Sequence, residues 1–227
     1  GKIPILVGGT GFYIQAVLND IAFTKEKQGD EIRADLQNLA KEKGASYLHH
    51  ELQKVDKESA EAIHPNNIKR VIRALEYFQS TGQKFSDHNK EERQKGSPYN
   101  FLYLVLTMNR KVLYERIDKR VDQMMEEGLV KEVKQLLDAG YSRNLVSMQG
   151  LGYKEIASAL FKECTMEEAV YRLKRDTRHF AKRQMTWFRR ERDVTMINKD
   201  NFSNNHDIVN YIMKLAVEKG ICSCREG

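Results

Sequence analysis

Long apolar runs and paired cysteines are both lacking in this 227-residue sequence. No uninterrupted apolar stretch is long enough to cross a bilayer, and the chain does not open with a basic and then apolar signal segment. Cys164 stands alone, while Cys222 and Cys224 lie in a polar tail. An odd count of three argues against a disulfide framework, and the absence of finger-type spacing argues against a zinc site. We therefore expect a cytoplasmic protein with no membrane partner and no metal ligands in this chain.

Familiar catalytic motifs are lacking as well. The sequence contains no G-x-x-x-x-G-K-[ST] phosphate-binding motif, and no Ser-His-Asp or Cys-His arrangement can be argued from it. His49, His50 and His64 have no cysteine or carboxylate partners at metal-ligand spacing, so we interpret them as surface or capping residues. Hydrophobic residues make up 41% of the chain, which suits a globular protein with a sizeable core.

Positive charge is concentrated in one segment. The chain has a net charge of +6, and residues 169–192 hold nine Lys and Arg against two acidic residues, so this segment carries +7 and the remainder −1. A local basic patch suits a polyanionic partner because each neutralised phosphate releases counterions. A solvated helix face is the alternative.

The basic segment divides between two sides of one predicted helix. One side holds Phe180, Ala181, Gln184, Met185, Trp187 and Phe188. The other holds Arg175, Arg178, Lys182 and Arg189. We predict that the aromatic side lies in the core, with base stacking as the alternative, and that the basic side is available for phosphate.

The rest of the pattern predicts an α/β fold with a parallel sheet. A strand at residues 3–7, a glycine turn and a helix at 12–18 form the first half of a parallel α/β unit. A second strand is expected at 101–106, helices at 111–127 and 129–138, and a short strand at 194–197 before a final helix. Another helix precedes the long basic one.

Between the first two predicted strands the pattern is helical only. Residues 30–82 keep helical spacing without a strand, with Asp56 as an N-cap and Gly82 after the last helix. Residues 84–100 lack periodicity and are predicted to be a linker. We therefore predict core segments at 1–27 and 95–227, and a helical insert at 28–94.

Two local features can carry chemistry. The turn Gly8–Gly11 lets backbone approach a ligand, and its Thr10 offers a hydroxyl, although a tight turn without a ligand is the alternative. Arg116 and Arg120 stand one helical turn apart, so both can reach one diphosphate; surface arginines paired with neighbouring carboxylates are the alternative.

Five stretches taken together resemble the tRNA dimethylallyltransferase, or tRNA isopentenyltransferase, family. They are PILVGGTGFYI (4–14), IHPNNIKRVIRALE (63–76), LYERIDKRVDQMMEEGLVKEV (113–133), QGLGYKEI (149–156) and DTRHFAKRQMTWFRR (176–190). The resemblance implies a P-loop NTPase-like parallel sheet core, incomplete at its N-terminus, with an all-helical insert. It also implies transfer of a dimethylallyl group from dimethylallyl diphosphate to N6 of the adenosine immediately 3′ of the anticodon, with release of diphosphate.

The resemblance also assigns residues. Thr10 matches the threonine beside the reacting amine and is the one catalytic candidate, also counted as a tRNA contact. Arg120, with Arg116 as its neighbour, is placed at the diphosphate. The implied tRNA contacts are Arg33, Lys69, Arg70, Val71, Ile72, Arg73, Gln149, Gly150, Leu151, Gly152, Tyr153, Lys154, Arg178, Lys182 and Arg183.

One departure from the family pattern changes what is expected of this chain. In the family, the P-loop and the aspartate that acts as general base precede the GGT strand, at which this sequence begins. The resemblance implies that the complete enzyme, a monomer, uses Mg²⁺ and the P-loop for the leaving group. We expect the chain alone to be an inactive fragment. The alternatives are an adenylate isopentenyltransferase that acts on free nucleotide, and a non-catalytic RNA-binding protein.

Overall fold

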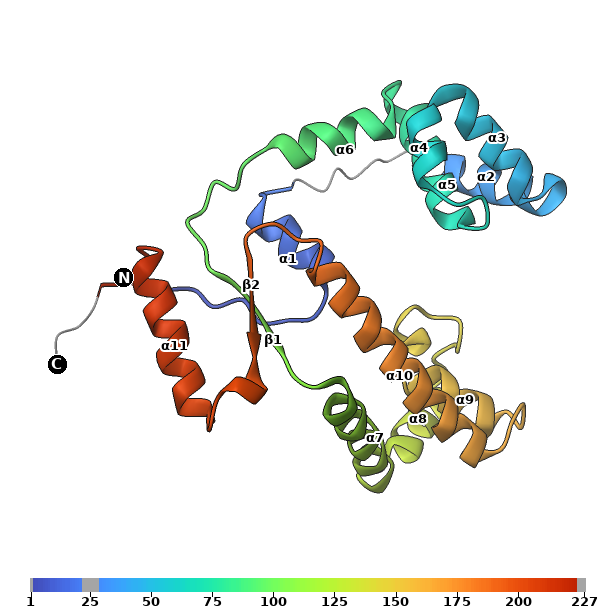
Figure 1. Cartoon of the computed structure of the whole chain (residues 1–227). Helices are drawn as coiled ribbons and strands as arrows, with labels where there is room; N and C mark the ends of the chain where they lie inside the picture. The colour runs from blue at the N-terminus through green and yellow to red at the C-terminus, as the bar shows by residue number, and fades with distance from the viewer. Residues whose placement is uncertain (1, 22–28, 224–227) are drawn as a thin grey trace. The chain divides into compact units, whose positions relative to one another are not determined.

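The computed structural model describes residues 2–21 and 29–223, which form two compact units (Figure 1). The sheet unit comprises Gly1–Gly11 with Asn100–Gly227, and the helical unit comprises Phe12–Tyr99. The predicted boundary between residues 27 and 28 falls outside the described residues. No helix in the described part of the chain is both long and apolar enough to cross a membrane.

The helical unit contains six helices among its described residues. They are α1 (Gly11–Leu18), which begins at the last residue of the sheet unit, α2 (Gly29–Lys43), α3 (Ala45–Val55), α4 (Lys57–Ala62), α5 (Ile68–Thr81) and α6 (Phe85–Gln94). The apolar stripe of α5 supplies most of the core, with Val71, Ile72 and Leu75 packed against Leu48 and Leu52 of α3. The predicted helical character of this stretch is confirmed, and Gly82 ends α5 in the left-handed conformation that a side chain disfavours.

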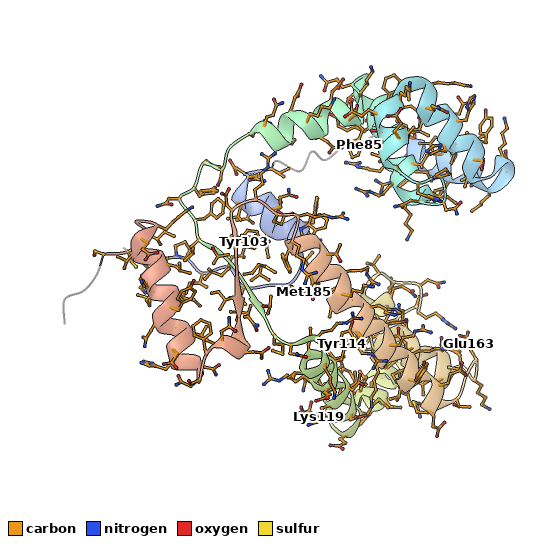
Figure 2. The ribbon with its side chains drawn as sticks, viewed as in Figure 1. Phe85, Tyr103, Tyr114, Lys119, Glu163 and Met185 are labelled. Atoms are coloured by element: carbon orange, nitrogen blue, oxygen red, sulfur yellow. The ribbon has the colours of Figure 1, made fainter. Side chains whose placement is uncertain are left out.

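The prediction that residues 84–100 form a linker is wrong for α6. Asp56 caps α4 by accepting a hydrogen bond from the Ser59 amide at 3.0 Å, and it also accepts one from the Ser86 amide at 2.8 Å. The second bond fixes the first turn of α6. Phe85, labelled in Figure 2, begins this helix, and its ring packs edge-on to that of Tyr77 at 5.6 Å. Burial by itself raises the pKa of Asp56. The hydrogen bonds from Ser59 and Ser86 together lower this pKa by more than burial raises it, so the net shift is downward. A tertiary contact therefore forms a helix that lacks an apolar repeat.

The sheet unit is built on two parallel strands, β1 (Tyr103–Thr107) and β2 (Val194–Asn198). Tyr103 pairs with Val194 and Thr107 with Asn198. The helices of this unit are α7 (Arg110–Glu126), α8 (Leu129–Asp138), α9 (Tyr153–Leu160), α10 (Met166–Phe188) and α11 (Asn205–Glu218), with short 3-10 turns at Ser147–Gln149 and Lys199–Asn201. Their core is formed by Val121, Leu129, Val133, Met148, Ile156, Ala157, Ala169 and Leu173.

The strand expected at residues 3–7 does not form in the structure. This stretch has no ladder partner among the described residues, and Ile5 and Val7 are 84% and 88% exposed. A strand exists only through pairing of its backbone groups with a neighbour, so an apolar run alone does not create one. The following helix is confirmed as α1.

The predicted burial of the aromatic side of α10 is correct only in part. Phe188 is buried and meets the Tyr103 ring edge-on at 6.2 Å, which joins the end of α10 to β1. Phe180 and Trp187 are each 40% exposed. Both α7 and α9 contact α10, and the helix residues buried along it besides Phe188 are Ala169 and Leu173, in its first half. Helical spacing identified the apolar side of α10. It did not predict which part of that side is covered by α7 and α9.

Candidate functional site

The glycine turn lies against the last third of α10. The Gln184 side-chain amide donates a hydrogen bond to the Gly9 carbonyl at 2.7 Å. A Cβ atom added at Gly11 would lie 2.1 Å from Nε1 of Trp187, so this glycine allows the indole to approach the backbone. Thr10, between them, is exposed. The turn is therefore held by α10 on either side of the predicted catalytic residue.

Two ion pairs join α7 to α10. Arg178 contacts Asp118 at 2.5 Å, and Lys174 contacts Asp122 at 2.6 Å, so the pairs repeat one turn apart on each helix. The Arg178 side chain is only 23% exposed. Its guanidinium, predicted to face tRNA, is thus committed to Asp118 in this structure.

The other sequence-predicted cations of these two helices are exposed. Arg116 and Arg120 are exposed on α7, and Arg120 lies 3.5 Å from the Glu127 carboxylate in a pair exposed on both sides. Lys182 and Arg183 are exposed on α10. Exposed pairs of this kind contribute little to stability, so Arg120 can exchange its partner for a phosphate.

The predicted tRNA loop from Gln149 to Lys154 is fastened by one buried carboxylate. Glu155 accepts a hydrogen bond from the Gly152 amide at 2.9 Å through Oε2, and its Oε1 lies 3.4 Å from Nζ of Lys154. Oε1 has no hydrogen-bond partner of good geometry, so Lys154 holds it by charge alone. Gly152 has a φ of 99°, a conformation that favours glycine. Gln149 donates to the Arg143 carbonyl at 2.6 Å, which closes the loop.

Other residues of the loop stretch have structural contacts. The Tyr153 hydroxyl hydrogen-bonds to Glu132 of α8, Leu151 is half-buried, and Gly150 is exposed. Gln149 and Tyr153 therefore anchor the loop, while Gly150 is exposed and the Lys154 side chain is 41% exposed.

A second buried carboxylate organises the helical unit. Arg33 of α2 donates to both oxygens of Glu76, with Nη2 at 2.9 and 3.0 Å and Nε at 3.3 Å. Arg73, one turn before Glu76 on α5, lies 3.5 Å from the same carboxylate. The Glu76 side chain is 2% exposed, whereas those of Arg33 and Arg73 are 45% and 46% exposed. The structure thus unites two of the sequence-predicted tRNA contacts, which lie forty residues apart in the chain.

The other predicted contacts on α5 separate by burial. Lys69 and Arg70 are exposed, but Val71 is 0% and Ile72 5% exposed, in the core. Their side chains therefore hold α5 in place and do not reach a partner.

Known proteins resemble this chain over most of its length. A model of the IPP transferase family matches residues 1–191. The chain is 56% identical over 221 residues to the tRNA dimethylallyltransferase of Lachnoclostridium phytofermentans, covering 97% of this chain and 71% of that protein. It is 49% identical over 209 residues to the tRNA dimethylallyltransferase of Acetivibrio thermocellus, covering 92% of this chain and 67% of that protein.

The chain belongs to the IPP transferase family.

Solved structures of relatives identify the fold. The full-length tRNA isopentenylpyrophosphate transferase of Bacillus halodurans has a TM-score of 0.60 and 41% identity, covering 93% of this chain and 66% of that one. A eukaryotic dimethylallyltransferase acting on tRNA has a TM-score of 0.71 and 26% identity, covering 94% of this chain and 57% of that one. The predicted α/β, P-loop NTPase-like fold class is thereby confirmed.

Glu76 and Glu155 were missed as functional candidates by sequence reasoning. Each places a carboxylate on the buried face of its helix, next to aliphatic core residues. A charged residue at a core position of an amphipathic helix is a usable signal, because burying a charge is costly unless it is paired. In this family member both carboxylates hold cations of the predicted tRNA-contacting stretches.

Proposed function

We propose that the protein transfers a dimethylallyl group from dimethylallyl diphosphate to N6 of the adenosine immediately 3′ of a tRNA anticodon, releasing diphosphate. The observation that supports this most is the Arg33–Glu76–Arg73 cluster beside the exposed Lys69 and Arg70. It presents more positive charge than a free nucleotide needs, on a unit in which every described regular element is a helix. Contacts to several phosphates position an RNA strand, while contacts to the base select the adenosine.

In the proposed reaction, the N6 nitrogen attacks the first carbon of the dimethylallyl group. The new N–C bond forms as the C–O bond to diphosphate breaks, and the proton leaves N6 for a general base. The family resemblance implies that this base is an aspartate of the P-loop segment. We assign the alignment of the amine to the Thr10 hydroxyl, which is exposed on a turn that Gln184 of α10 holds through the Gly9 carbonyl. We assign Arg120, with Arg116, to the negative charge that develops on the departing diphosphate.

The resemblance also implies Mg²⁺ at the diphosphate. Among the described residues no group of three or more His, Cys, Asp or Glu side chains could hold a metal ion. The nearby carboxylates of Asp118 and Asp122 are already paired with Arg178 and Lys174. No step of the proposed transfer is therefore assigned to a metal held by these residues.

We further propose that the 227-residue chain assayed by itself binds tRNA but transfers nothing. It contains no G-x-x-x-x-G-K-[ST] sequence with which to hold the diphosphate. A general base typically contributes about 10²- to 10⁴-fold to a rate, and the resemblance places that base outside the matched stretches. Label incorporated from dimethylallyl diphosphate over many turnovers would show that catalytic groups lie within these residues.

The substrate proposal is tested by comparing two acceptors. The 227 residues are joined to a P-loop segment of the family, giving what we call the joined enzyme, and it receives labelled dimethylallyl diphosphate with either an anticodon stem-loop RNA or AMP. We expect transfer to the stem-loop and little to AMP. Comparable transfer to AMP would favour an adenylate isopentenyltransferase, and RNA binding without transfer to either acceptor would favour a non-catalytic RNA-binding protein.

A further inference from the structure

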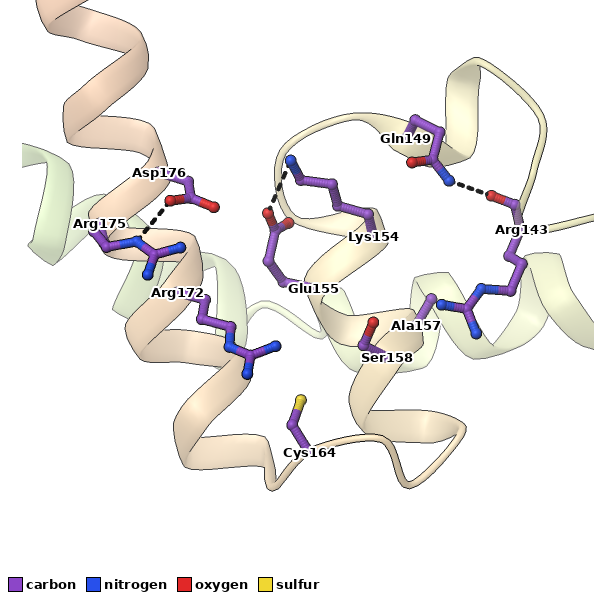
Figure 3. A pocket seen from close by; sticks show the side chains of 10 residues that line it. All are labelled: Arg143, Gln149, Lys154, Glu155, Ala157, Ser158, Cys164, Arg172, Arg175 and Asp176. Atoms are coloured by element: carbon purple, nitrogen blue, oxygen red, sulfur yellow. Dashed lines mark hydrogen bonds and ion pairs between the residues drawn. The ribbon is translucent and has the colours of Figure 1, made fainter. Parts of the chain in front are cut away.

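A polar hollow of about 450 Å³ lies between α9 and the first half of α10 (Figure 3). Its volume falls in the range of about 300–1,000 Å³ typical of pockets that hold a ligand. Four cations line it, namely Arg143, Lys154, Arg172 and Arg175, against the carboxylates of Glu155 and Asp176. Gln149, Ala157, Ser158 and Cys164 complete the lining. The lining residues carry a net charge of +2, which the carboxylates of Glu163 and Glu168, paired with Arg143 and Arg172, balance until a ligand displaces them.

We propose that this hollow binds a phosphodiester of the RNA strand that contacts the Gln149–Lys154 loop. The proposal rests on the proposed function, because that loop supplies two of the lining residues, Gln149 and Lys154. A strand lying on the loop would bring a backbone phosphate within reach of the cations below it. Arginine guanidinium groups suit such a group because their planar N–H donors match the geometry of phosphate oxygens.

The cations enter from different elements and converge. Figure 3 shows the guanidinium groups of Arg143 and Arg172 pointing into the hollow from opposite sides, with Ser158 and Cys164 between them. Arg172 belongs to α10, and Arg143 comes from the segment that follows α8. The Arg143 guanidinium is also steadied over the Phe161 ring, 5.0 Å from its centroid.

Arg172 can turn toward a phosphate at little cost, whereas Arg143 would exchange a two-bond contact with Glu163, to whose oxygens it donates at 2.5 and 3.0 Å. Arg143 pairs with Glu163 and Arg172 with Glu168, each at 2.5 Å, but these two carboxylate side chains are 49% and 48% exposed. Hydrogen bonds from Arg143 and then Ser158 lower the pKa of Glu163 to about 2, so this carboxylate is charged at neutral pH. Exposed pairs contribute little net stability, and water can solvate the released carboxylates.

The frame of the hollow is rigid before any ligand arrives. Ile156 and Ala157 of α9 pack on Ala169 and Leu173 of α10, and all four are at most 1% exposed. The buried Glu155 holds Lys154 at the rim by charge, as described above. A preformed cationic site loses less entropy on binding than one that must be assembled.

The test measures binding of an anticodon stem-loop RNA by the 227-residue chain over a range of salt concentrations. The double variant Arg143→Gln with Arg172→Gln removes two cations of the hollow. The matched control is Lys214→Gln with Lys219→Gln, two exposed lysines at α11 that change the net charge equally. The single variant Arg172→Lys keeps the charge but loses the planar fork, and thermal denaturation confirms that each variant is folded.

We expect the pocket variant to bind the stem-loop about tenfold more weakly than the control, with the slope of log affinity against log salt reduced by about 0.7–0.9, the value for one phosphate. Arg172→Lys should fall between wild type and the double variant. A pocket variant that matches the control overturns the proposal while leaving the proposed function intact. Wild-type chain that does not bind the stem-loop overturns both.

A second arm distinguishes an RNA phosphate from a small one. Inorganic pyrophosphate is titrated into the wild-type chain and the pocket variant by calorimetry. We expect weak binding that the two proteins share. Tight pyrophosphate binding that only the pocket variant loses, with stem-loop affinity equal to that of the control, would assign the hollow to a free diphosphate and refute the phosphodiester.

Discussion

Replacing Glu76 by glutamine separates two electrostatic effects that act in opposite directions on RNA binding. The substitution removes a negative charge near the proposed RNA surface, which by itself strengthens binding. With a salt slope of about 0.7–0.9 per charge, one extra positive charge contributes roughly four- to sixfold in affinity at 0.15 M salt relative to 1 M. The same substitution releases the guanidinium groups of Arg33 and Arg73 from the carboxylate that holds them.

The affinity lost because Arg33 and Arg73 are no longer held in place should exceed the affinity gained from removing the negative charge of Glu76. Immobilising a flexible side chain costs about 0.5–1.5 kcal/mol, so two freed arginines weaken binding by about 1–3 kcal/mol, or roughly 5- to 150-fold. We therefore expect Glu76→Gln to lower the affinity for an anticodon stem-loop despite the more favourable net charge. Because both arginine side chains are nearly half exposed, water solvates them afterwards, and we expect a loss in unfolding free energy of about 1–3 kcal/mol.

The assay is fluorescence anisotropy of labelled stem-loop RNA, at a temperature where circular dichroism shows the variant folded. Glu51→Gln serves as the control, because it removes the same charge from α3 of the same unit, where Glu51 pairs with Lys54 at 2.7 Å. Tighter RNA binding by the Glu76 variant than by this control would show that charge outweighs positioning. A lowered melting temperature with unchanged affinity would reduce Glu76 to a structural residue.

Three further predictions concern the turn and the helical unit. Gly11→Ala should cost about 1–3 kcal/mol of stability because its methyl group would overlap the Trp187 indole. The control in the same thermal melts is Gly8→Ala, whose methyl group would meet nothing within 4 Å. Equal melting temperatures of the two variants would contradict the close approach of Trp187 to Gly11. Because the pKa of Asp56 is lowered in the folded state, its contribution is fully present above its ordinary value of 3.8 and disappears as pH falls through the lowered pKa. The difference in unfolding free energy between wild type and Asp56→Asn should therefore shrink in that acidic window, and a difference independent of pH would be incompatible with it. Thr10→Ala in the joined enzyme should slow transfer about 5- to 150-fold while the fold stays intact, since one aligning hydrogen bond is worth roughly 1–3 kcal/mol. A rate within twofold of wild type would make Thr10 a turn residue only.

Local signals in the sequence predicted much of the fold. Gly128 separates α7 from α8 and has a φ of 103°, and α8 spans the predicted residues 129–138. Asp56 was predicted as an N-cap and accepts the Ser59 amide as such a residue does. In each case the determining interaction lies within a few residues, so the local pattern contains it.

The predictions that were wrong or incomplete depend on residues that are distant in sequence. The start of α6 depends on the Ser86 amide reaching a carboxylate thirty residues earlier, which no periodicity reveals. Ile5 and its neighbours read as a strand but lack a partner among the described residues. The partners of Arg178 and Arg33 are also distant in sequence, so burial and pairing of the candidate site could be seen only in the folded chain.

The proposed function requires prenyl transfer to one adenosine of tRNA. Its most direct test is nucleoside mass spectrometry of an anticodon stem-loop after reaction with isotopically labelled dimethylallyl diphosphate and the joined enzyme. We expect one label per RNA, on N6 of the adenosine immediately 3′ of the anticodon, and none when that adenosine is replaced by guanosine. Label on other adenosines, or label that persists after the replacement, would contradict it.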